Sequence, residues 1–315
     1  MKVLVTGGCG YIGQHVVEAC CAAGHKVTVV DSGSAFSGIF DGTMLHGMRL
    51  DAMSPFVSYH DAVIHLAASI SVAESVREPH LYYTNNVVEG IKLLEWCRRV
   101  RASKIIFASS AAVYGPNDGS PIDEELPCRP ANPYAASKLI LEWALADYAR
   151  AYGIQAIPLR LFNVAGGSFR EEHEPETHLI PNLVDAAYYG RPVTIHHSPK
   201  HGTHGATDTC ERDYVNVRDV ARAFVAAVEG SIDLAAGEAI NIGSGGAHTT
   251  RYVIAAVGRA TGRKLDVRME PARPGDVATL CADIAKARAV LGWTPQHSSI
   301  EEIVRDTIAT RSPTA

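Results

Sequence analysis

The run of glycines near the start of the chain constrains the fold more than any other feature. A short apolar stretch, "KVLV", leads into "TGGCGYIG", and "QHVVEACCAAG" then follows with helical spacing. A second apolar stretch, "KVTVVD", ends at Asp31. Strand, glycine turn, helix, strand and acid, in that order, form a dinucleotide-binding unit. The sequence therefore predicts the α/β class, with a doubly wound parallel sheet.

The three glycines of this unit have separate tasks. Gly7 permits the tight turn, Gly10 lets the backbone approach a pyrophosphate, and Gly13 lets the helix lie close to the strand. The first N–H groups of that helix would face the phosphates. Asp31 suits a ribose diol and would repel a 2′-phosphate, and no arginine follows it in "DSGS". We therefore expect the cofactor to be NAD rather than NADP.

A tyrosine and a lysine share one face of a later helix. In "NPYAASK" a helix that begins after Pro133 places Tyr134 and Lys138 one turn apart. Making a tyrosine a base at neutral pH means lowering its pKa from about 10, at a cost of roughly 4 kcal/mol. An ammonium about 4 Å away supplies about that much at an effective dielectric of 20. The pair is therefore a candidate proton-transfer device.

Composition limits the classes of partner. A chain of 315 residues fits one large α/β unit or two lobes. Its net charge of -5 gives no reason to expect nucleic acid or an anionic membrane as a partner. No apolar run reaches the ~18 residues of a membrane span. Seven scattered cysteines without a C-x-x-C pair are typical of reduced thiols, so we expect a cytoplasmic protein.

The histidines of "IHHSPKHGTHGATDTC" (195–210) raise the question of a metal site. Their spacing matches no closed set of ligands. We expect a polar loop over the substrate here, and we predict no metal.

The spacing G-x-x-G-x-x-G together with "YAASK" resembles the extended branch of the short-chain dehydrogenase/reductase superfamily, which has a Rossmann fold. The resemblance continues in order along "DAVIHLAA" (61–68), "YYTNNVVEGIKLLEWCRR" (82–99) and "IIFASSAAVYG" (105–115). It implies a catalytic set of Ser110, Tyr134 and Lys138, with Ser109 as the alternative serine. It also implies these cofactor-binding residues: Gly7, Gly10, Tyr11, Ile12, Gly13, Asp31, Leu66, Ala67, Ala68, Asn85, Tyr134, Lys138 and Phe162.

Three later stretches resemble the NAD-dependent UDP-glucose 4-epimerase family: "LRLFN" (159–163), "TDTCERDYVNVRDV" (207–220) and "PARPGDVATLCAD" (271–283). Arginine suits a diphosphate because its planar fork can hold two oxygens at once. The resemblance implies a UDP-sugar substrate. It implies that the substrate is held by Ser110, Tyr134, Asn163, His178, Thr194, Arg212, Arg273, Asp276 and Leu280.

The implied activity is epimerisation at C4 of a UDP-hexose of the UDP-glucose/UDP-galactose type, through a transient 4-keto sugar. A 4,6-dehydratase is disfavoured because "SSAAVYG" has Ala111 and Ala112 where that class carries an acidic pair. The alternatives are a C4-epimerase of UDP-N-acetylglucosamine or UDP-glucuronate, another NAD-dependent nucleotide-sugar oxidoreductase, and a non-catalytic NAD-binding scaffold. Leu280, of intermediate size, predicts some tolerance for a larger C2 substituent.

The resemblance also implies a domain plan and a dimer. An NAD-binding Rossmann domain would comprise 1–165 with a return segment 213–245. A smaller nucleotide-sugar-binding lobe would comprise 166–212 and 246–315. The helices at 82–100 and 133–152 would pair across a two-fold axis in a homodimer.

The chain departs from that family at several positions. The stretch between Asp31 and "MRLDA" is shorter than in the family, so the adenine contacts within 32–51 stay open. Ile70 stands where bacterial glucose epimerases carry a lysine, and His178 stands in place of an asparagine of the uridine region. These differences leave the physiological sugar undetermined.

Overall fold

A computed structural model describes residues 1–32, 43–46, 59–117, 121–167, 178–200, 207–273 and 276–311. Most of the stretch 32–51, where the sequence leaves the adenine contacts open, lies outside these residues. None of the helices described is long and apolar enough to cross a membrane.

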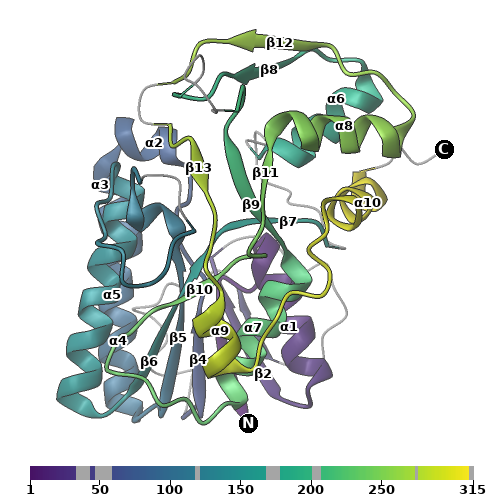
Figure 1. Cartoon of the computed structure of the whole chain (residues 1–315). Coiled ribbons are helices and arrows are strands. Elements are labelled where there is room, and N and C mark those ends of the chain that lie inside the picture. Colours follow the sequence, from purple (N-terminus) through teal and green to yellow (C-terminus); the bar gives the residue numbers. More distant parts are fainter. Residues whose placement is uncertain are drawn as a thin grey trace.

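A seven-stranded sheet forms the larger part of the molecule (Figure 1). All of its neighbouring strands are parallel. Their spatial order is β10 (Ile240–Ile242), β6 (Gln155–Leu161), β5 (Lys104–Ser110), β4 (Ala62–His65), β1 (Lys2–Thr6), β2 (Lys26–Asp31) and β3 (Thr43–His46). The chain moves from β1 outward to β2, and later to β4 on the other side of β1. This reversal confirms the doubly wound parallel sheet. In such folds ligands bind at the carboxyl ends of the strands, where the strand order reverses.

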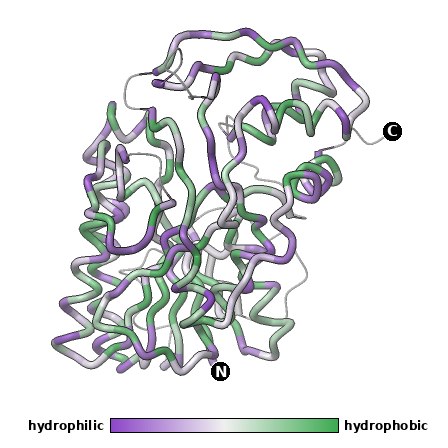
Figure 2. The backbone as a smooth tube through the Cα atoms, viewed as in Figure 1, coloured by the Kyte–Doolittle hydropathy of each residue, from purple (hydrophilic) through white to green (hydrophobic). Residues whose placement is uncertain are grey.

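Apolar residues cover both faces of this sheet. Figure 2 shows largely hydrophobic colour along its central strands. Alternate residues go to opposite faces because side chains of a strand alternate. On β1, Val3 and Val5 belong to the core cluster with α1 (Tyr11–Ala22) and α7 (Val217–Glu229). Leu4 belongs to the cluster with α4 (Glu89–Val100) and α5 (Pro133–Tyr152). The sheet is therefore covered by helices on both sides.

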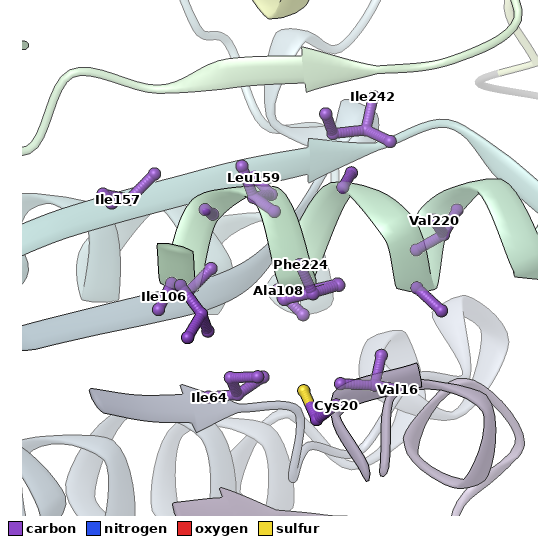
Figure 3. Close-up of a cluster of buried hydrophobic side chains, with 14 of the residues drawn as sticks. Val16, Cys20, Ile64, Ile106, Ala108, Ile157, Leu159, Val220, Phe224 and Ile242 are labelled. Atoms are coloured by element: carbon purple, nitrogen blue, oxygen red, sulfur yellow. The ribbon is translucent and has the colours of Figure 1, made fainter. Parts of the chain in front are cut away.

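The first of these clusters joins the sheet to two helices that are far apart in sequence. In Figure 3, Ile64, Ile106 and Leu159 extend from successive strands toward Val16 of α1 and Phe224 of α7. All five side chains are fully buried. This packing fixes the start of α1, and with it the glycine turn, against the sheet.

The two signals at the ends of α5 explain its limits. Asn132 accepts a hydrogen bond from the Ala135 N–H at 2.9 Å, and Pro133 occupies the first helical position. Gly153 ends the helix with a φ of 70°, a conformation that glycine adopts without strain. The expected helix at 133–152 is confirmed.

A long helical segment before β5 departs from the regular helix expected at 82–99. It consists of α3 (Pro79–Tyr82), a π-helical turn η2 (Tyr83–Val88) and then α4. A short helix, α2 (Val72–Arg77), precedes it, and a 3₁₀ turn, η3 (Ala111–Tyr114), follows β5.

A smaller part of the molecule lies beyond the carboxyl ends of the large sheet (Figure 1). One of its sheets has the order β11 (Ala247–Thr249), β9 (Glu211–Asn216) and β13 (Thr279–Leu280), and β7 (Asn163–Ala165) also pairs with β9. A two-stranded sheet consists of β8 (Val193–His196) and β12 (Val267–Glu270). A separate apolar core unites α6 (Leu179–Tyr189), α8 (Thr250–Thr261) and α10 (Ile300–Arg311).

The division of the chain into domains stays a proposal. Strand β9 spans the proposed boundary at 212/213. Within the proposed lobe segment 246–315, α9 (Ala285–Leu291) contacts β10 and α7 of the larger part. The chain therefore passes between the two parts several times.

Candidate active site

The glycine turn between β1 and α1 has no room for side chains at two positions. Gly7 has a φ of 75°, and a Cβ there would lie 2.5 Å from the Ala67 nitrogen. A Cβ on Gly13 would lie 2.1 Å from the Gly7 carbonyl oxygen. The amides of Leu66 and Ala67 both donate to the Thr6 carbonyl oxygen, at 3.0 and 3.1 Å. The turn and the segment after β4 therefore pack directly against each other.

Gly10 differs from these two glycines because its open side is not occupied by protein. A Cβ there would approach only the Gly7 oxygen, at 3.4 Å. Gly10 is the N-cap of α1, with ordinary extended dihedral angles. A glycine is therefore not demanded here by the fold, and an approaching phosphate would account for it. The helix start that follows, at Tyr11 and Ile12, presents its amides to the same space.

Asp31 lies at the same end of the sheet as the glycine turn. It ends β2, and its carboxylate accepts a hydrogen bond from the Cys9 N–H at 2.9 Å. This bond holds the acid beside the glycine turn. The turn, the helix start and the acid together fit a dinucleotide with a free ribose diol. Tyr11 additionally donates to the Gly166 carbonyl oxygen at 2.5 Å, which ties the turn to the segment after β7.

The π-helical turn η2 brings two asparagines to the end of β4. Asn85 donates to the Ser69 hydroxyl at 3.0 Å. Asn86, which the sequence analysis did not select, donates to the Ser69 carbonyl oxygen at 3.0 Å and to the Ser137 hydroxyl at 2.9 Å. Such wider turns often occur at functional sites. Ala68, one of the predicted cofactor-binding residues, immediately precedes Ser69, which the two asparagines hold in place.

Ser110, Tyr134 and Lys138 meet where β5 ends and α5 begins. The Ser110 hydroxyl accepts the Ala112 N–H at 3.2 Å and also hydrogen-bonds the Tyr134 side chain. Burial raises the pKa of Tyr134, and the hydrogen bond with Ser110 lowers it. The Lys138 nitrogen lies 6.0 Å from the centre of the Tyr134 ring. Ser109, the alternative, bonds instead to the Glu142 carboxylate, one helical turn beyond Lys138.

Lys138 is buried, and burial disfavours the charged form of its ammonium group. The side chain is only 3% exposed, and its ammonium donates to the Ala108 carbonyl oxygen at 2.8 Å. Its nitrogen also lies 4.9 Å from the centre of the Phe107 ring, a cation–π distance. Burial lowers the pKa of Lys138 to about 7, while the charge of Glu142 raises it. The lysine is therefore close to losing its charge at neutral pH.

A buried polar network lies beside the predicted catalytic set. Ser109 donates to the Glu142 carboxylate. Arg160 grips the same carboxylate with two hydrogen bonds, of 3.1 and 2.8 Å. The sequence analysis missed Glu142 and Arg160. The helical spacing from Tyr134 to Lys138 to Glu142 is a signal that could have found the glutamate.

Arg212 and Leu280 are neighbours across two paired strands. β9 and β13 are parallel, and these two residues are partners in the register. Asn163 begins β7 and donates to the Asp213 carbonyl oxygen at 3.1 Å. The Asp213 carboxylate is fully buried and accepts hydrogen bonds from the amides of residues 244, 245 and 282. One buried aspartate therefore ties two other chain segments, 244–245 and 282, to the strand that carries Arg212.

Arg273 and Asp276 form an ion pair with each other, with nitrogen–oxygen distances of 3.1 and 3.3 Å. The Arg273 side chain is 63% exposed. Phe162, in contrast, is buried, and its N–H donates to the Ile242 carbonyl oxygen at 3.0 Å. The structure thus places Arg273 near solvent and Phe162 inside a small apolar cluster.

The remaining predicted substrate residues lie in the smaller part. His178 is the N-cap of α6, and Thr194 is exposed on β8, where it pairs with Arg268 of β12. Of the histidine-rich stretch 195–210, residues 201–206 lie outside the described part of the chain. Within that part, no group of three or more His, Cys, Asp or Glu side chains could hold a metal ion.

The fold and the site define a class: an NAD-binding, doubly wound α/β enzyme of the extended short-chain dehydrogenase/reductase type. The family described as "NAD dependent epimerase/dehydratase family" matches residues 3–243 of the chain.

Similar proteins cover nearly the whole chain. A UDP-glucose 4-epimerase of Corynebacterium glutamicum is 37% identical, over 97% of this chain and 94% of that protein. The crystal structure of the UDP-glucose 4-epimerase of Brucella ovis in complex with NAD is 39% identical, with a TM-score of 0.87, over 97% of this chain and 96% of that one. A UDP-N-acetylglucosamine 4-epimerase of Methanobrevibacter ruminantium, in complex with UDP-N-acetylmuramic acid, is 30% identical, with a TM-score of 0.85, over 98% and 97%.

The chain belongs to the NAD-dependent epimerase/dehydratase family. Within it the chain is an NAD-dependent enzyme similar to UDP-glucose 4-epimerases. The predicted family, fold class and cofactor are thereby confirmed.

Proposed function

We propose that the protein interconverts the C4 epimers of a UDP-hexose, of the UDP-glucose/UDP-galactose type, through a transient 4-keto sugar. The observation that carries this proposal is the meeting of Ser110, Tyr134 and Lys138 at the carboxyl end of β5, on the same edge of the sheet as the glycine turn that follows β1. A non-catalytic scaffold has no need for a hydrogen-bonded serine and tyrosine with a buried lysine beside them. The relatives' similarity over the full length supports the same proposal.

The residues proposed to hold NAD are those of the glycine turn, Asp31, the segment after β4 and Lys138. When bound, NAD supplies reversible oxidation of the sugar at C4. The protein's own task is to remove a proton from the 4-hydroxyl as the ketone forms, and to return it afterwards. Tyr134 is the proposed base, because its titratable oxygen is hydrogen-bonded to Ser110. Ser110 would hydrogen-bond the same sugar oxygen and keep it in line with Tyr134.

Lys138 is proposed to favour the ionised form of Tyr134. Burial alone raises the pKa of this tyrosine, so the site needs a nearby positive charge to offset that effect. Lys138 provides the charge as long as it stays protonated. Its ammonium has three donors, so it can keep its bond to Ala108 and still reach a ribose hydroxyl.

The nucleotide is proposed to be held more firmly than the sugar. Arg212 and Arg273 would bind the diphosphate, Asn163 would donate to it, and Asp276 would accept from a ribose hydroxyl. Binding a diphosphate would require Arg273 to exchange its ion pair with Asp276 for the ligand. A firm grip on the nucleotide and a roomier sugar pocket would let the 4-keto sugar turn over before it is reduced on its other face.

The choice of sugar rests on the pocket wall at Leu280. Leu280 packs against the apolar cluster that contains Phe162 and Leu139. Its size supports UDP-glucose and UDP-galactose as substrates, with some tolerance for an N-acetyl group. The similarity to a UDP-N-acetylglucosamine 4-epimerase favours that sugar as the second candidate. UDP-glucuronate stays an alternative substrate.

A homodimer through α4 and α5 is also proposed. Val88, Ile91 and Trp143 are exposed apolar side chains on η2, α4 and α5, and Trp143 is 61% exposed. Large apolar side chains of this kind are common where proteins associate. The cytoplasmic location expected from the cysteines stays a prediction.

The proposal is tested on the purified protein in two steps. The protein is denatured and the supernatant is assayed for NAD, which should be present because an enzyme with no net redox change must retain its cofactor. The native protein is then incubated with UDP-glucose without added NAD, and the nucleotide sugars are analysed by NMR. UDP-galactose should form. Absence of bound NAD, with no sugar conversion, would overturn the proposal.

A further inference from the structure

The helix that carries the catalytic pair presents a third charged residue on the same face. Tyr134, Lys138 and Glu142 are spaced at i, i+4 and i+8 along α5. Glu142 is only 4% exposed, although an isolated carboxylate is costly to bury. The mechanism above gives it no role. A buried charge that the fold could have avoided calls for a function.

The Glu142 carboxylate is clamped by residues from two strands. Arg160 of β6 binds it in a bidentate manner, and Ser109 of β5 donates to one of the same oxygens. Arg160 also donates to the Tyr114 hydroxyl at 2.9 Å, and Tyr114 donates to Asn241 of β10 at 2.7 Å. The carboxylate therefore has a fixed place relative to both the helix and the strand that ends at Ser110.

We infer that Glu142 is a positioning residue for the proton-transfer pair: its clamped negative charge, one turn beyond Lys138, keeps the lysine ammonium in its charged form beside Tyr134. This inference rests on the proposed function. Burial lowers the pKa of Lys138 to about 7, and Glu142 is the group that raises it. Without Glu142 the lysine would be largely neutral at the pH where Tyr134 needs it.

The other charged groups around Lys138 allow the sign of this effect to be derived. His65 of β4 stacks on Phe107 under the lysine, and its pKa is lowered to about 3 by burial and then by Lys138, so it is neutral. On α5 the neighbours are Tyr134 and Glu142, and on β6 Arg160 faces Glu142. Removing the negative charge of Glu142 makes the Lys138 proton easier to lose, and a neutral lysine no longer favours the ionised form of Tyr134. The alkaline limb of the pH–rate profile, where Lys138 loses its charge, should therefore move to lower pH. The acid limb, where Tyr134 ionises, should move to higher pH.

The test is the variant Glu142→Gln, which keeps the shape of the side chain and removes its charge. The alkaline limb of its profile of kcat against pH should move to lower pH by about one unit, so that the profile narrows. Arg160→Gln, which leaves Glu142 without its cation, should move the alkaline limb in the opposite direction. Because breaking a buried pair can unfold a protein, each variant is first checked by thermal melting and for retained NAD. If either variant fails to fold, the other still tests the sign.

Two controls separate charge from structure. Glu142→Asp keeps the charge and should return the profile to that of the unsubstituted protein. Glu89→Gln removes a buried carboxylate that pairs with Lys92 of α4 and lies outside this network, and it should leave the profile in place. A fall in kcat by the same factor at every pH in Glu142→Gln, with unmoved limbs, would overturn the inference.

A second readout needs no turnover. The absorbance of ionised tyrosine is titrated in the NAD-loaded protein and in its Tyr134→Phe counterpart, and the difference isolates Tyr134. The same comparison is made in the Glu142→Gln background, where the Tyr134 transition should move to higher pH because the lysine beside it is no longer charged. If the sugar is not converted but this transition moves, the proposed function fails and the inference on Glu142 stands. An unmoved transition contradicts the inference whatever the activity.

Discussion

The proposed proton-transfer centre and the proposed nucleotide-binding residues are built in different ways. Lys138 is 3% exposed, and its helix is tied by Glu142 and Arg160 to the large sheet. Arg273 is 63% exposed and lies in a loop of the smaller part, where its partner Asp276 is only three residues away. The first set is held by residues distant in sequence, and the second by a local pair.

This difference indicates a division of labour. Proton transfer requires atoms held to a fraction of an ångström, which buried contacts from several elements can provide. Binding a nucleotide requires residues that can exchange an internal partner for the ligand. An exposed ion pair suits this task because breaking it costs little free energy. We therefore expect substitutions in the first region to reduce kcat, and substitutions in the second to raise KM.

The largest effect should come from Tyr134→Phe. The change removes only the titratable oxygen, so the fold and bound NAD should be retained. Loss of a positioned base should reduce kcat by about 10³-fold or more. The measurement is the rate of UDP-galactose formation at several pH values. Activity within about tenfold of the unsubstituted protein, a difference of only about 1.4 kcal/mol in barrier, would show that another group is the base.

Gly10→Ala tests the cofactor cradle separately from the fold. The added methyl group meets only the Gly7 oxygen at 3.4 Å, so the melting temperature should change little. The methyl group would lie where a pyrophosphate approaches, so NAD should bind about 10–100-fold more weakly, as expected for overpacking. Gly258→Ala in α8, also with a nearest contact at 3.4 Å, is the matched control. Equal NAD retention in both variants would place the cofactor elsewhere.

How far the sequence predicts the structure depends on whether the relevant contacts are local. The limits of α5 were predictable because Asn132, Pro133 and Gly153 act within one turn of the helix ends. The glycine turn was predictable for the same reason. The π-helical turn η2 was not, since it depends on contacts of Asn86 with Ser69 and Ser137, the latter 51 residues away.

The candidate site, too, depends on contacts between residues that are distant in sequence and that the sequence alone does not reveal. The pairing of Glu142 with Arg160, and of Arg212 with Leu280, joins residues that only the fold brings together. Sequence reasoning therefore selected chemically reactive residues and missed the buried carboxylate behind them. The hydrogen bond from the Lys138 ammonium to the Ala108 carbonyl oxygen, 30 residues away in sequence, likewise depends on the fold.

Arg273→Ala should raise KM for UDP-glucose about tenfold, because one charge-assisted hydrogen bond to phosphate is lost at a partly exposed site. The value of kcat should change by less than about threefold, because the proposed role of Arg273 is to bind the diphosphate and not to act at the reacting carbon. Arg268→Ala, an exposed arginine of β12, is the matched control. A drop in kcat with unchanged KM would contradict the proposed division between the two regions.

Leu280→Tyr should have the smallest effect on UDP-glucose, with kcat/KM reduced about threefold. The larger side chain should penalise UDP-N-acetylglucosamine by a further factor of about ten, the usual range for a steric change in a pocket. The measurement compares kcat/KM for UDP-glucose, UDP-N-acetylglucosamine and UDP-glucuronate in both proteins. Equal losses on the first two sugars would show that Leu280 does not line the sugar pocket.

The central claim is that the sugar is oxidised and reduced at the same carbon, with no net redox change. It is tested most directly with UDP-glucose that carries deuterium at C4 and an excess of that substrate over the protein. NMR of the product should show UDP-galactose with the deuterium still at C4, and the total amount of reduced NAD should stay below the amount of protein. Deuterium that migrates to another carbon, or a 4-keto sugar that accumulates as reduced NAD forms stoichiometrically, would contradict the account.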